Sequence, residues 1–329
     1  MLRNYFLLAA LLTSLSIQVK AQKVDYVLVV HGGAGNMKDL EKDSIHAAAY
    51  YAALDSALEI GNEILAKGGD GELAVLSVVS YFEQNPLFNA GIGATCTADG
   101  QFELDASIMR GKDLMAGAVA GVKLTKHPIK AAHAVMTQTQ HVMLSGAGAD
   151  RFALEHGLEM VDDNMYFVTP KTMEWIDKLK QESKKKGTVG CVVLDSKGNL
   201  TAGTSTGGMF KKQWGRIGDS PLIGAGTYAD NASSAVSCTG HGEYFIRHIV
   251  AYNLCSRVKL LKESIQEAAD HIIFEELNEK EGNGGLIAVD RNGNIAMSFN
   301  SNGMFRGFIK KETGNSNIIK KIGIGKVLK

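Results

Sequence analysis

Two segments in the second half of the chain share one pattern, and this pattern constrains the fold more than any other feature. Apolar residues 188–194 and 200–206 flank the turn sequence Asp-Ser-Lys-Gly-Asn, and apolar residues 285–289 and 295–299 flank Asp-Arg-Asn-Gly-Asn. Asp, Asn and Gly favour tight turns between antiparallel strands. Each segment is therefore predicted to form a β-hairpin.

The rest of the chain alternates between strand and helix patterns. A continuous apolar run at 26–31 predicts a buried strand, and residues 101–108 and 117–124 predict two more. Helical spacing, caps and breakers predict helices over residues 44–67, 72–84, 129–138, 172–180, 243–255 and 261–277. Hairpins separated by helices predict an antiparallel α+β layered fold rather than a doubly wound parallel sheet.

Composition excludes one class of function. Lys and Arg number 35, as do Asp and Glu, so the net charge is zero. Binding to nucleic acid depends on clustered Lys and Arg, so such a partner is not expected. The four cysteines have no zinc-site spacing and are expected to be buried small apolar residues rather than ligands; they are Cys96, Cys191, Cys238 and Cys255.

The first 21 residues have the pattern of a secretory signal peptide. Arg3 precedes an apolar run at 6–15, and Val19-Lys-Ala21 places small residues at the cleavage positions. The run is too short to span a bilayer, and no other run is long enough. We therefore expect a periplasmic or secreted protein that begins at Gln22 and has no membrane span.

A polar stretch over residues 157–187 ends in three lysines and predicts an exposed, flexible connector. Gly187 and Thr188 follow these lysines and open an apolar strand. A cut between them would make Thr188 an N-terminal residue. Its Oγ would then be a nucleophile and its own α-amine, with an ordinary pKa of about 7.7–8.0, would be the base.

A serine hydrolase is the competing interpretation of the glycine-rich motifs. Residues 203–207 match G-x-S-x-G around Ser205, and residues 31–35 (HGGAG) resemble an esterase oxyanion loop. The remaining triad positions would be filled by Asp219 or Asp230 and by His241 or His248. A nucleophile elbow requires a helix directly after the serine, and Gly207, Gly208 and Gly215 prevent a long helix from starting there. The threonine interpretation is therefore favoured.

Six segments, in order, resemble the plant-type asparaginase and isoaspartyl peptidase family of Ntn-hydrolases. They cover nearly the whole chain after residue 21: HGGAG (31–35), PLFNAGIGA (86–94), ELDASIM (103–109), GTVGCVVLDSKGNLTAGTSTGGM (187–209), GRIGDSPLIGAGTYADN (215–231) and SCTGHGE (237–243). The resemblance implies a four-layer αββα sandwich, cut at Gly187-Thr188. The α subunit would be 22–187, ending in a linker at about 157–187, and the β subunit 188–329. Family members pair as (αβ)2 dimers.

The resemblance also assigns roles to individual residues. Thr188 matches the nucleophile, Thr206 the threonine that tunes it, and Asn89 a polar group that supports it. Thr239 and Gly240 match the oxyanion hole and also contact the substrate. Arg216, Asp219 and Gly242 match the other substrate contacts.

The expected substrate follows from two of these residues. Arg216 would hold an α-carboxylate in a bidentate manner and Asp219 an α-ammonium, as in L-asparagine and β-aspartyl dipeptides, with release of L-aspartate. No organic cofactor is implied. A structural sodium ion would be bound by the main-chain carbonyls of Phe82, Glu83, Asn85, Phe88, Ala90 and Ile92.

Two other functions stay open at this stage. A glycosylasparaginase would perform the same chemistry on a glycan-linked asparagine. A non-catalytic binding protein could retain the fold, although intact Thr188, Arg216, Asp219 and Thr239 argue against that alternative.

Overall fold

The computed structural model describes residues 24–38, 40, 43–170, 172–173, 187–277, 282–315 and 317–329. The expected signal peptide, the lysine-rich end of the connector and most of the helix predicted at 172–180 lie outside the described residues.

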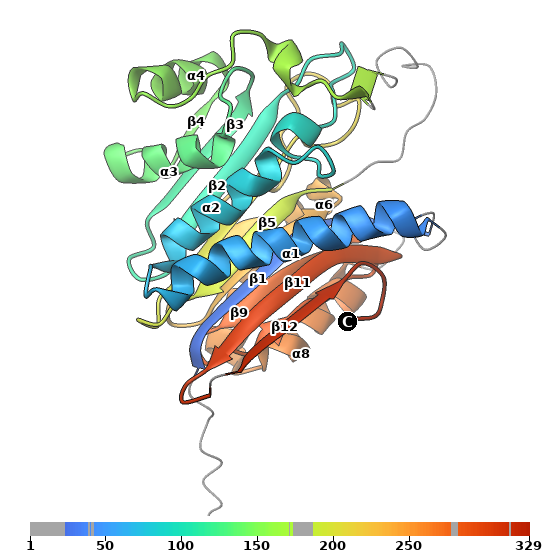
Figure 1. Ribbon diagram of the computed structural model, residues 1–329. Helices are drawn as coiled ribbons and strands as arrows, with labels where there is room; N and C mark the ends of the chain where they lie inside the picture. The colour runs from blue at the N-terminus through green and yellow to red at the C-terminus, as the bar shows by residue number, and fades with distance from the viewer. Residues whose placement is uncertain are drawn as a thin grey trace, which may run out of the picture.

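Two β-sheets pack face to face, and helices cover the outer face of each (Figure 1). The larger sheet has the spatial order β12 (Ile318–Gly323), β11 (Gly303–Glu312), β1 (Val24–Gly35), β5 (Val189–Leu194), β6 (Leu200–Thr206), β2 (Leu104–Arg110), β3 (Ala116–Val122), β4 (Met143–Ser145). The smaller sheet has the order β10 (Ile295–Ala296), β9 (Gly284–Asp290), β8 (Ser234–Gly240), β7 (Thr227–Ala229). All neighbouring strands are antiparallel except β3 and β4. The predicted αββα sandwich is confirmed.

Helices from the two halves of the chain form the outer layers. The larger sheet is covered by α1 (Ser44–Ala66), α2 (Gly71–Glu83) and α3 (Pro128–Gln138), with α4 (Gly146–Glu155) beside β3 and β4. The smaller sheet is covered by α6 (Gly242–His248), α7 (Val250–Ser256) and α8 (Ile265–Asp270). Three buried apolar clusters fill the three gaps between adjacent layers. Burial of apolar surface in these gaps is the main force that holds the layers together.

Local signals explain why the first helices begin where they were predicted. Asp43 caps α1 by accepting from the His46 N–H, and Asp70 caps α2 by accepting from the Leu73 N–H. Each cap satisfies a donor that has no partner inside the helix. The predicted helix at 129–138 is confirmed as α3, with Pro128 in its first turn.

Both predicted hairpins are confirmed, but they belong to different sheets. The turn between β5 and β6 is closed by Asp195, and the turn between β9 and β10 by Asp290. In each turn one carboxylate oxygen accepts main-chain N–H groups two and four residues further on. The second hairpin is shorter than predicted, because β10 ends at Ala296.

Of the two long helices predicted in the second half, the one at 243–255 is interrupted and the one at 261–277 begins later than predicted, at Ile265. Ile249 has a left-handed backbone (φ 48°) that separates α6 from α7. Lys262 (φ 61°) separates a π turn, Arg257–Leu261, from α8, where Ser264 starts the helix in a capping box with Glu267. A second π turn, His271–Glu276, continues α8.

The stretch predicted as a connector begins as packed structure. A short 3-10 helix, Asn164–Phe167, buries Phe167 in the core of the larger sheet. The Asn164 side chain donates to the carbonyls of Phe102 and Lys123. The first part of the predicted connector is therefore fixed to residues that flank β2 and β3. All four cysteines are buried and unpaired, as expected.

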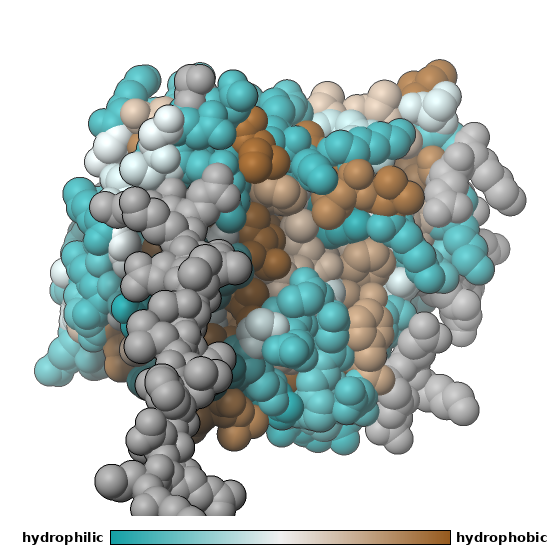
Figure 2. All heavy atoms as spheres, turned by 90° about the horizontal axis from the view of Figure 1, so that it is seen from below, coloured by the Kyte–Doolittle hydropathy of each residue, from teal (hydrophilic) through white to brown (hydrophobic). Residues whose placement is uncertain are grey.

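Polar residues dominate the face shown in Figure 2, and apolar residues gather in a hollow near its centre.

Within the part of the chain that the structure describes, no helix combines the length and the apolar character that a membrane span requires.

Candidate active site

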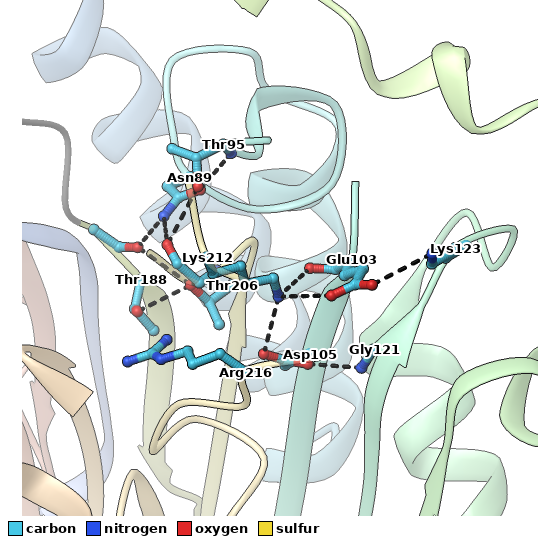
Figure 3. Close-up of polar contacts among 12 residues, drawn as sticks. Asn89, Thr95, Glu103, Asp105, Gly121, Lys123, Thr188, Thr206, Lys212 and Arg216 are labelled. Carbon is cyan, nitrogen blue, oxygen red and sulfur yellow. Dashed lines mark hydrogen bonds and ion pairs between the residues drawn. The ribbon is translucent and has the colours of Figure 1, made fainter. Parts of the chain in front are cut away.

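Thr188 lies directly before β5, which pairs with β1 on one side and β6 on the other. The strand is buried along its whole length, so its start is held firmly in the middle of the larger sheet. Thr206 ends β6 opposite this point. The Thr188 hydroxyl donates to Thr206 Oγ1 at 3.1 Å (Figure 3).

The main-chain carbonyl of Gly187 accepts two hydrogen bonds. Asn89 Nδ2 donates to it at 2.6 Å and Thr206 Oγ1 donates at 3.2 Å. Asn89 is itself fixed, because Nδ2 also donates to the Gly208 carbonyl and Oδ1 accepts from the Thr95 N–H. A continuous chain of donors thus runs from the Thr188 hydroxyl through Thr206 to the Gly187 oxygen.

A pocket opens beside Thr188 and brings most of the predicted site residues together. Its lining includes Thr188, Thr206, Arg216, Asp219 and Gly240, and also residues that sequence reasoning did not assign: Met209, Gly218 and Ser220. Thr239 lies at the end of β8, in the smaller sheet, and Thr188 in the larger one. The site therefore forms where the two sheets meet.

The end of β8 carries Thr239 and Gly240, the two residues predicted to form the oxyanion hole. Thr239 Oγ1 accepts from the Ala34 N–H at 3.2 Å, so its own hydrogen is not used in that bond. A side chain at Gly240 would lie 2.6 Å from Gly284 Cα, so the strands approach too closely for any residue but glycine. At Gly242 a Cβ would lie 2.8 Å from Arg216 Nη2, so glycine at this position leaves room for the Arg216 side chain.

Asp219 is a buried carboxylate within this pocket. Burial raises its pKa to about 7, against the lowering effect of its own main-chain N–H and of Arg216. Its Oδ2 has no hydrogen-bond partner among the described residues. A buried acceptor of this kind is costly unless something binds it. A ligand ammonium would satisfy it.

Arg216 is held by Glu243, a residue that was not predicted to belong to the site. Nε and Nη2 of Arg216 donate to the two Glu243 oxygens at 2.9 and 3.0 Å. Burial raises the pKa of Glu243, but the hydrogen bonds from Arg216 produce a net lowering. One edge of the guanidinium is occupied by Glu243, whereas Nη1 donates to none of the described residues. The clue in the sequence was the acidic residue that ends SCTGHGE.

A buried ion pair supports the strand end that carries Thr206. Lys212 Nζ donates to the Glu103 carbonyl at 2.8 Å and lies 3.8 Å from Asp105 Oδ2 (Figure 3). Burial raises the pKa of Asp105 and lowers that of Lys212. The charge of Lys212 lowers the pKa of Asp105 and the charge of Asp105 raises that of Lys212, so each residue counteracts the effect of burial on the other. Asp105 lies opposite Thr206 in the pairing of β2 with β6.

Hydroxyl groups form a second buried polar cluster, between the two sheets. His31 Nε2 contacts Ser237 Oγ at 2.9 Å, and the chain continues through Thr204 and Thr227 to Ser107, whose hydroxyl donates to the Ser220 carbonyl. Burial lowers the pKa of His31 to about 3, so the ring is neutral at physiological pH. The cluster ties the loop that carries Asp219 to both sheets.

The structure contradicts the serine-hydrolase interpretation. Ser205 is fully buried on the opposite face of β6 from Thr206, because successive strand residues alternate between faces. Its hydroxyl donates to Glu83 Oε1 at 2.7 Å. Of the proposed triad partners, Asp230 pairs with Lys259 and His248 with Glu276, while His241 lines the pocket rim.

Comparisons with known proteins give a consistent result. The model of a protein family described as asparaginase matches residues 24–319. The isoaspartyl peptidase of Salmonella typhimurium is 44% identical over 294 residues, covering 85% of this chain and 94% of the relative. That of Escherichia coli is 43% identical, covering 85% and 91%. The human isoaspartyl peptidase/L-asparaginase is 40% identical over 287 residues, covering 84% and 91%.

The αββα sandwich, with a threonine at the start of a central strand, defines the Ntn-hydrolase class of folds. Within that class, the chain belongs to the asparaginase family that its sequence motifs suggested.

We predict that Lys212→Met destabilises the protein by about 3–5 kcal/mol, because it leaves the Asp105 carboxylate buried without a counter-charge. The double variant Lys212→Met/Asp105→Asn should recover part of this loss, since it removes both charges. Urea denaturation of the three proteins measures the effect. Equal stability of the single variant and the parent would show that Asp105 is already protonated in the fold.

Proposed function

We propose that this protein is an amidohydrolase that hydrolyses β-aspartyl dipeptides and L-asparagine and releases L-aspartate. The observation that carries the proposal is the shared pocket of Thr188, Arg216 and Asp219, which joins a nucleophile to a cation and an anion. The reported relatives are isoaspartyl peptidases, which favours this substrate class over a glycan-linked asparagine.

The first step in our proposal is cleavage of the chain by its own threonine. The Thr188 hydroxyl attacks the Gly187 carbonyl carbon, and its proton moves through the Thr206 hydroxyl to the peptide nitrogen of Thr188. The developing oxyanion keeps the donors from Asn89 and Thr206 that the carbonyl already has. The peptide nitrogen then leaves with a proton, giving an ester, and water hydrolyses the ester to a Gly187 carboxylate and a free Thr188.

The second step is substrate hydrolysis by the freed threonine. The α-amine of Thr188 removes the proton from its own Oγ, which attacks the side-chain carbonyl of the bound aspartyl unit. Thr239 Oγ1–H and the Gly240 N–H would stabilise the oxyanion. Loss of one such donor costs about 3–4 kcal/mol in other hydrolases. The amine leaves with the proton, and water releases L-aspartate from the ester.

Recognition of the aspartyl head would divide between two charged residues. The free edge of the Arg216 guanidinium binds the α-carboxylate, with Glu243 fixing the other edge. Asp219 binds the α-ammonium through its unpaired Oδ2. Both groups are free in L-asparagine and in β-linked dipeptides, but the α-carboxyl is part of the bond in an α-linked peptide.

We also propose a sodium ion in the loop after α2. The carbonyls of Glu83 and Phe88 face the glycines of the 3-10 turn Gly91–Gly93 so closely that a Cβ on Gly91 or Gly93 would meet them at 2.0 or 1.9 Å. Carbonyl oxygens suit a hard cation. Comparison of the melting temperature in sodium salts with that in choline salts would test whether sodium binds. The full expected ligand set is Phe82, Glu83, Asn85, Phe88, Ala90 and Ile92.

Location and assembly complete the proposal. The N-terminal pattern supports export, with a mature chain that begins at Gln22, which N-terminal sequencing of the periplasmic fraction would test. The family resemblance supports an (αβ)2 dimer, which light scattering would test. The subunits would be residues 22–187 and 188–329.

We expect active protein to contain two chains, the second beginning at Thr188. Thr188→Ala should remain one chain without activity, because it has no nucleophile. Thr188→Ser should cut slowly, since a hydroxyl remains. Asn89→Ala should also slow cleavage, because it removes a donor from the Gly187 oxygen. Mass spectrometry of each protein gives the answer, and a fully active uncut chain would sink the mechanism.

The pH dependence should reveal Asp219. Below its pKa of about 7 the carboxylate is protonated and cannot bind the substrate ammonium, so kcat/KM should rise with pH through about 7. Bound substrate stabilises the ionised carboxylate of Asp219, so the acidic limb of the kcat profile should lie at lower pH than the acidic limb of the kcat/KM profile. The α-amine titrates on the same side, but it affects kcat as well. Identical limbs in both profiles would count against a binding role for Asp219.

We expect the protein to cleave β-Asp-Leu and L-Asn and to reject α-Asp-Leu by about 10⁴-fold or more, because buried charges would stay unpaired. Arg216→Lys keeps the charge but loses the bidentate fork, so kcat/KM should fall by about 100-fold. Parallel assays of the three substrates measure both effects. Comparable cleavage of the α-linked dipeptide would refute this reading of the aspartyl head.

A further inference from the structure

The two donors that hold the Gly187 carbonyl oxygen come from different parts of the chain. Asn89 belongs to the loop that follows α2, whereas Thr206 ends β6. In the self-cleavage step proposed above, both donors must reach one oxygen at the same moment. A misplacement of about 1 Å in such an arrangement can cost about 100-fold in rate. The position of the loop relative to the strand end is therefore important for the reaction.

The residues on either side of Thr206 are both tied to this part of the chain. After Thr206, the Gly207 N–H donates to the Asn89 carbonyl at 3.0 Å. Before it, the Ser205 hydroxyl donates at 2.7 Å to Oε1 of Glu83, the last residue of α2. Because successive strand residues point to opposite faces, the Ser205 bond lies on the face of β6 that is turned away from the pocket. Thr206 is thus held between two ties, one on each side.

The Glu83 carboxylate is a fixed anchor for this bond. Its side chain is fully buried, and His127 Nδ1 lies 3.4 Å from its Oε2. Its Oε1 also accepts from the Ile129 N–H, in the first turn of α3, at 2.9 Å. A carboxylate is stabilised at the N-terminus of a helix. This capping contact does not require the Ser205 hydroxyl, so the bond from β6 to Glu83 needs a reason of its own.

The cleavage step and the turnover step depend on this bond to different degrees. Once the chain is cut, the Gly187 carbonyl takes no further part in the proposed mechanism. The oxyanion of substrate hydrolysis would then be held by Thr239 and Gly240, at the end of β8 in the smaller sheet. Among the described residues, the Glu83 carboxylate accepts hydrogen bonds from β6 and α3. Its effect should therefore be confined mainly to cleavage.

We propose that Ser205 and Glu83 are positioning residues for self-cleavage. Their hydrogen bond fixes the end of β6 against the end of α2, so that Thr206 and Asn89 meet on the Gly187 oxygen. Both act through these two donors, from the far side of the strand. This inference rests on the proposed function, because it concerns the cleavage step of that mechanism.

The first measurement is the rate of cleavage. Full-length chain made by cell-free translation is quenched at intervals, and the uncut chain is measured on a denaturing gel. We expect Ser205→Ala to cut at least about 10-fold more slowly than the parent. Glu83→Gln keeps an acceptor for the Ser205 hydroxyl and should cut within about 3-fold of the parent.

The matched control is Ser80→Ala, which also removes a buried hydroxyl next to this region. Ser80 lies on α2, as Glu83 does, and its Oγ has no hydrogen-bond partner among the described residues. Since no bond is lost, this variant should cut within about 2-fold of the parent.

The second measurement separates positioning from a general loss of structure. After cleavage has run to completion, each protein is assayed with β-Asp-Leu, and kcat and KM per cut chain should both stay within about 3-fold of the parent. Cleavage of Ser205→Ala at the parent's rate, or an equal fall in its cleavage rate and its kcat/KM, would overturn the positioning role and leave the proposed function intact. A parent chain that never cuts would overturn the proposed function itself.

Discussion

The pairing of β5 between β1 and β6 is the constraint on which the rest of the site depends. These ladders place the start of β5 at a buried position in the larger sheet, directly opposite the end of β6. Thr188 and Thr206 are therefore brought within hydrogen-bond distance by the main chain, before any side chain contributes. The donors on the Gly187 carbonyl depend on the same register. A shift of β5 by one residue would turn Thr188 to the other face.

The site gathers charge at a cost that the surrounding structure offsets. Asp219, Asp105 and Lys212 are all buried, and burial alone would disfavour their charged forms. Neither Asp105 Oδ2 nor Asp219 Oδ2 has a hydrogen-bond partner among the described residues, but Asp105 Oδ2 forms an ion pair with Lys212 behind Thr206, and Asp219 forms none with a described residue. This difference separates the carboxylate that supports the strand from the carboxylate that faces the pocket. It also explains why Asp219 is the better candidate for binding a substrate cation.

Sequence patterns predicted the hairpins, the first three helices and the layered fold, because caps, turn residues and periodicity act over a few residues. Asp195 and Asp290 close their turns through contacts two and four residues away. The breaks at Ile249 and Lys262 were not predictable in this way, since neither residue type favours a left-handed backbone. Strands β8, β11 and β12 were missed as well. Their pairing with distant strands is decided by the tertiary fold.

The sequence by itself supplied the candidate nucleophile, and its resemblance to the motifs of a known family supplied the charged pair and the oxyanion residues. Only the tertiary structure showed that Glu243 holds one edge of Arg216 and that Ser205 donates to Glu83. The physical reason is that local sequence specifies which groups are available. Their distances are fixed by strand register and layer packing, which join segments far apart in the chain.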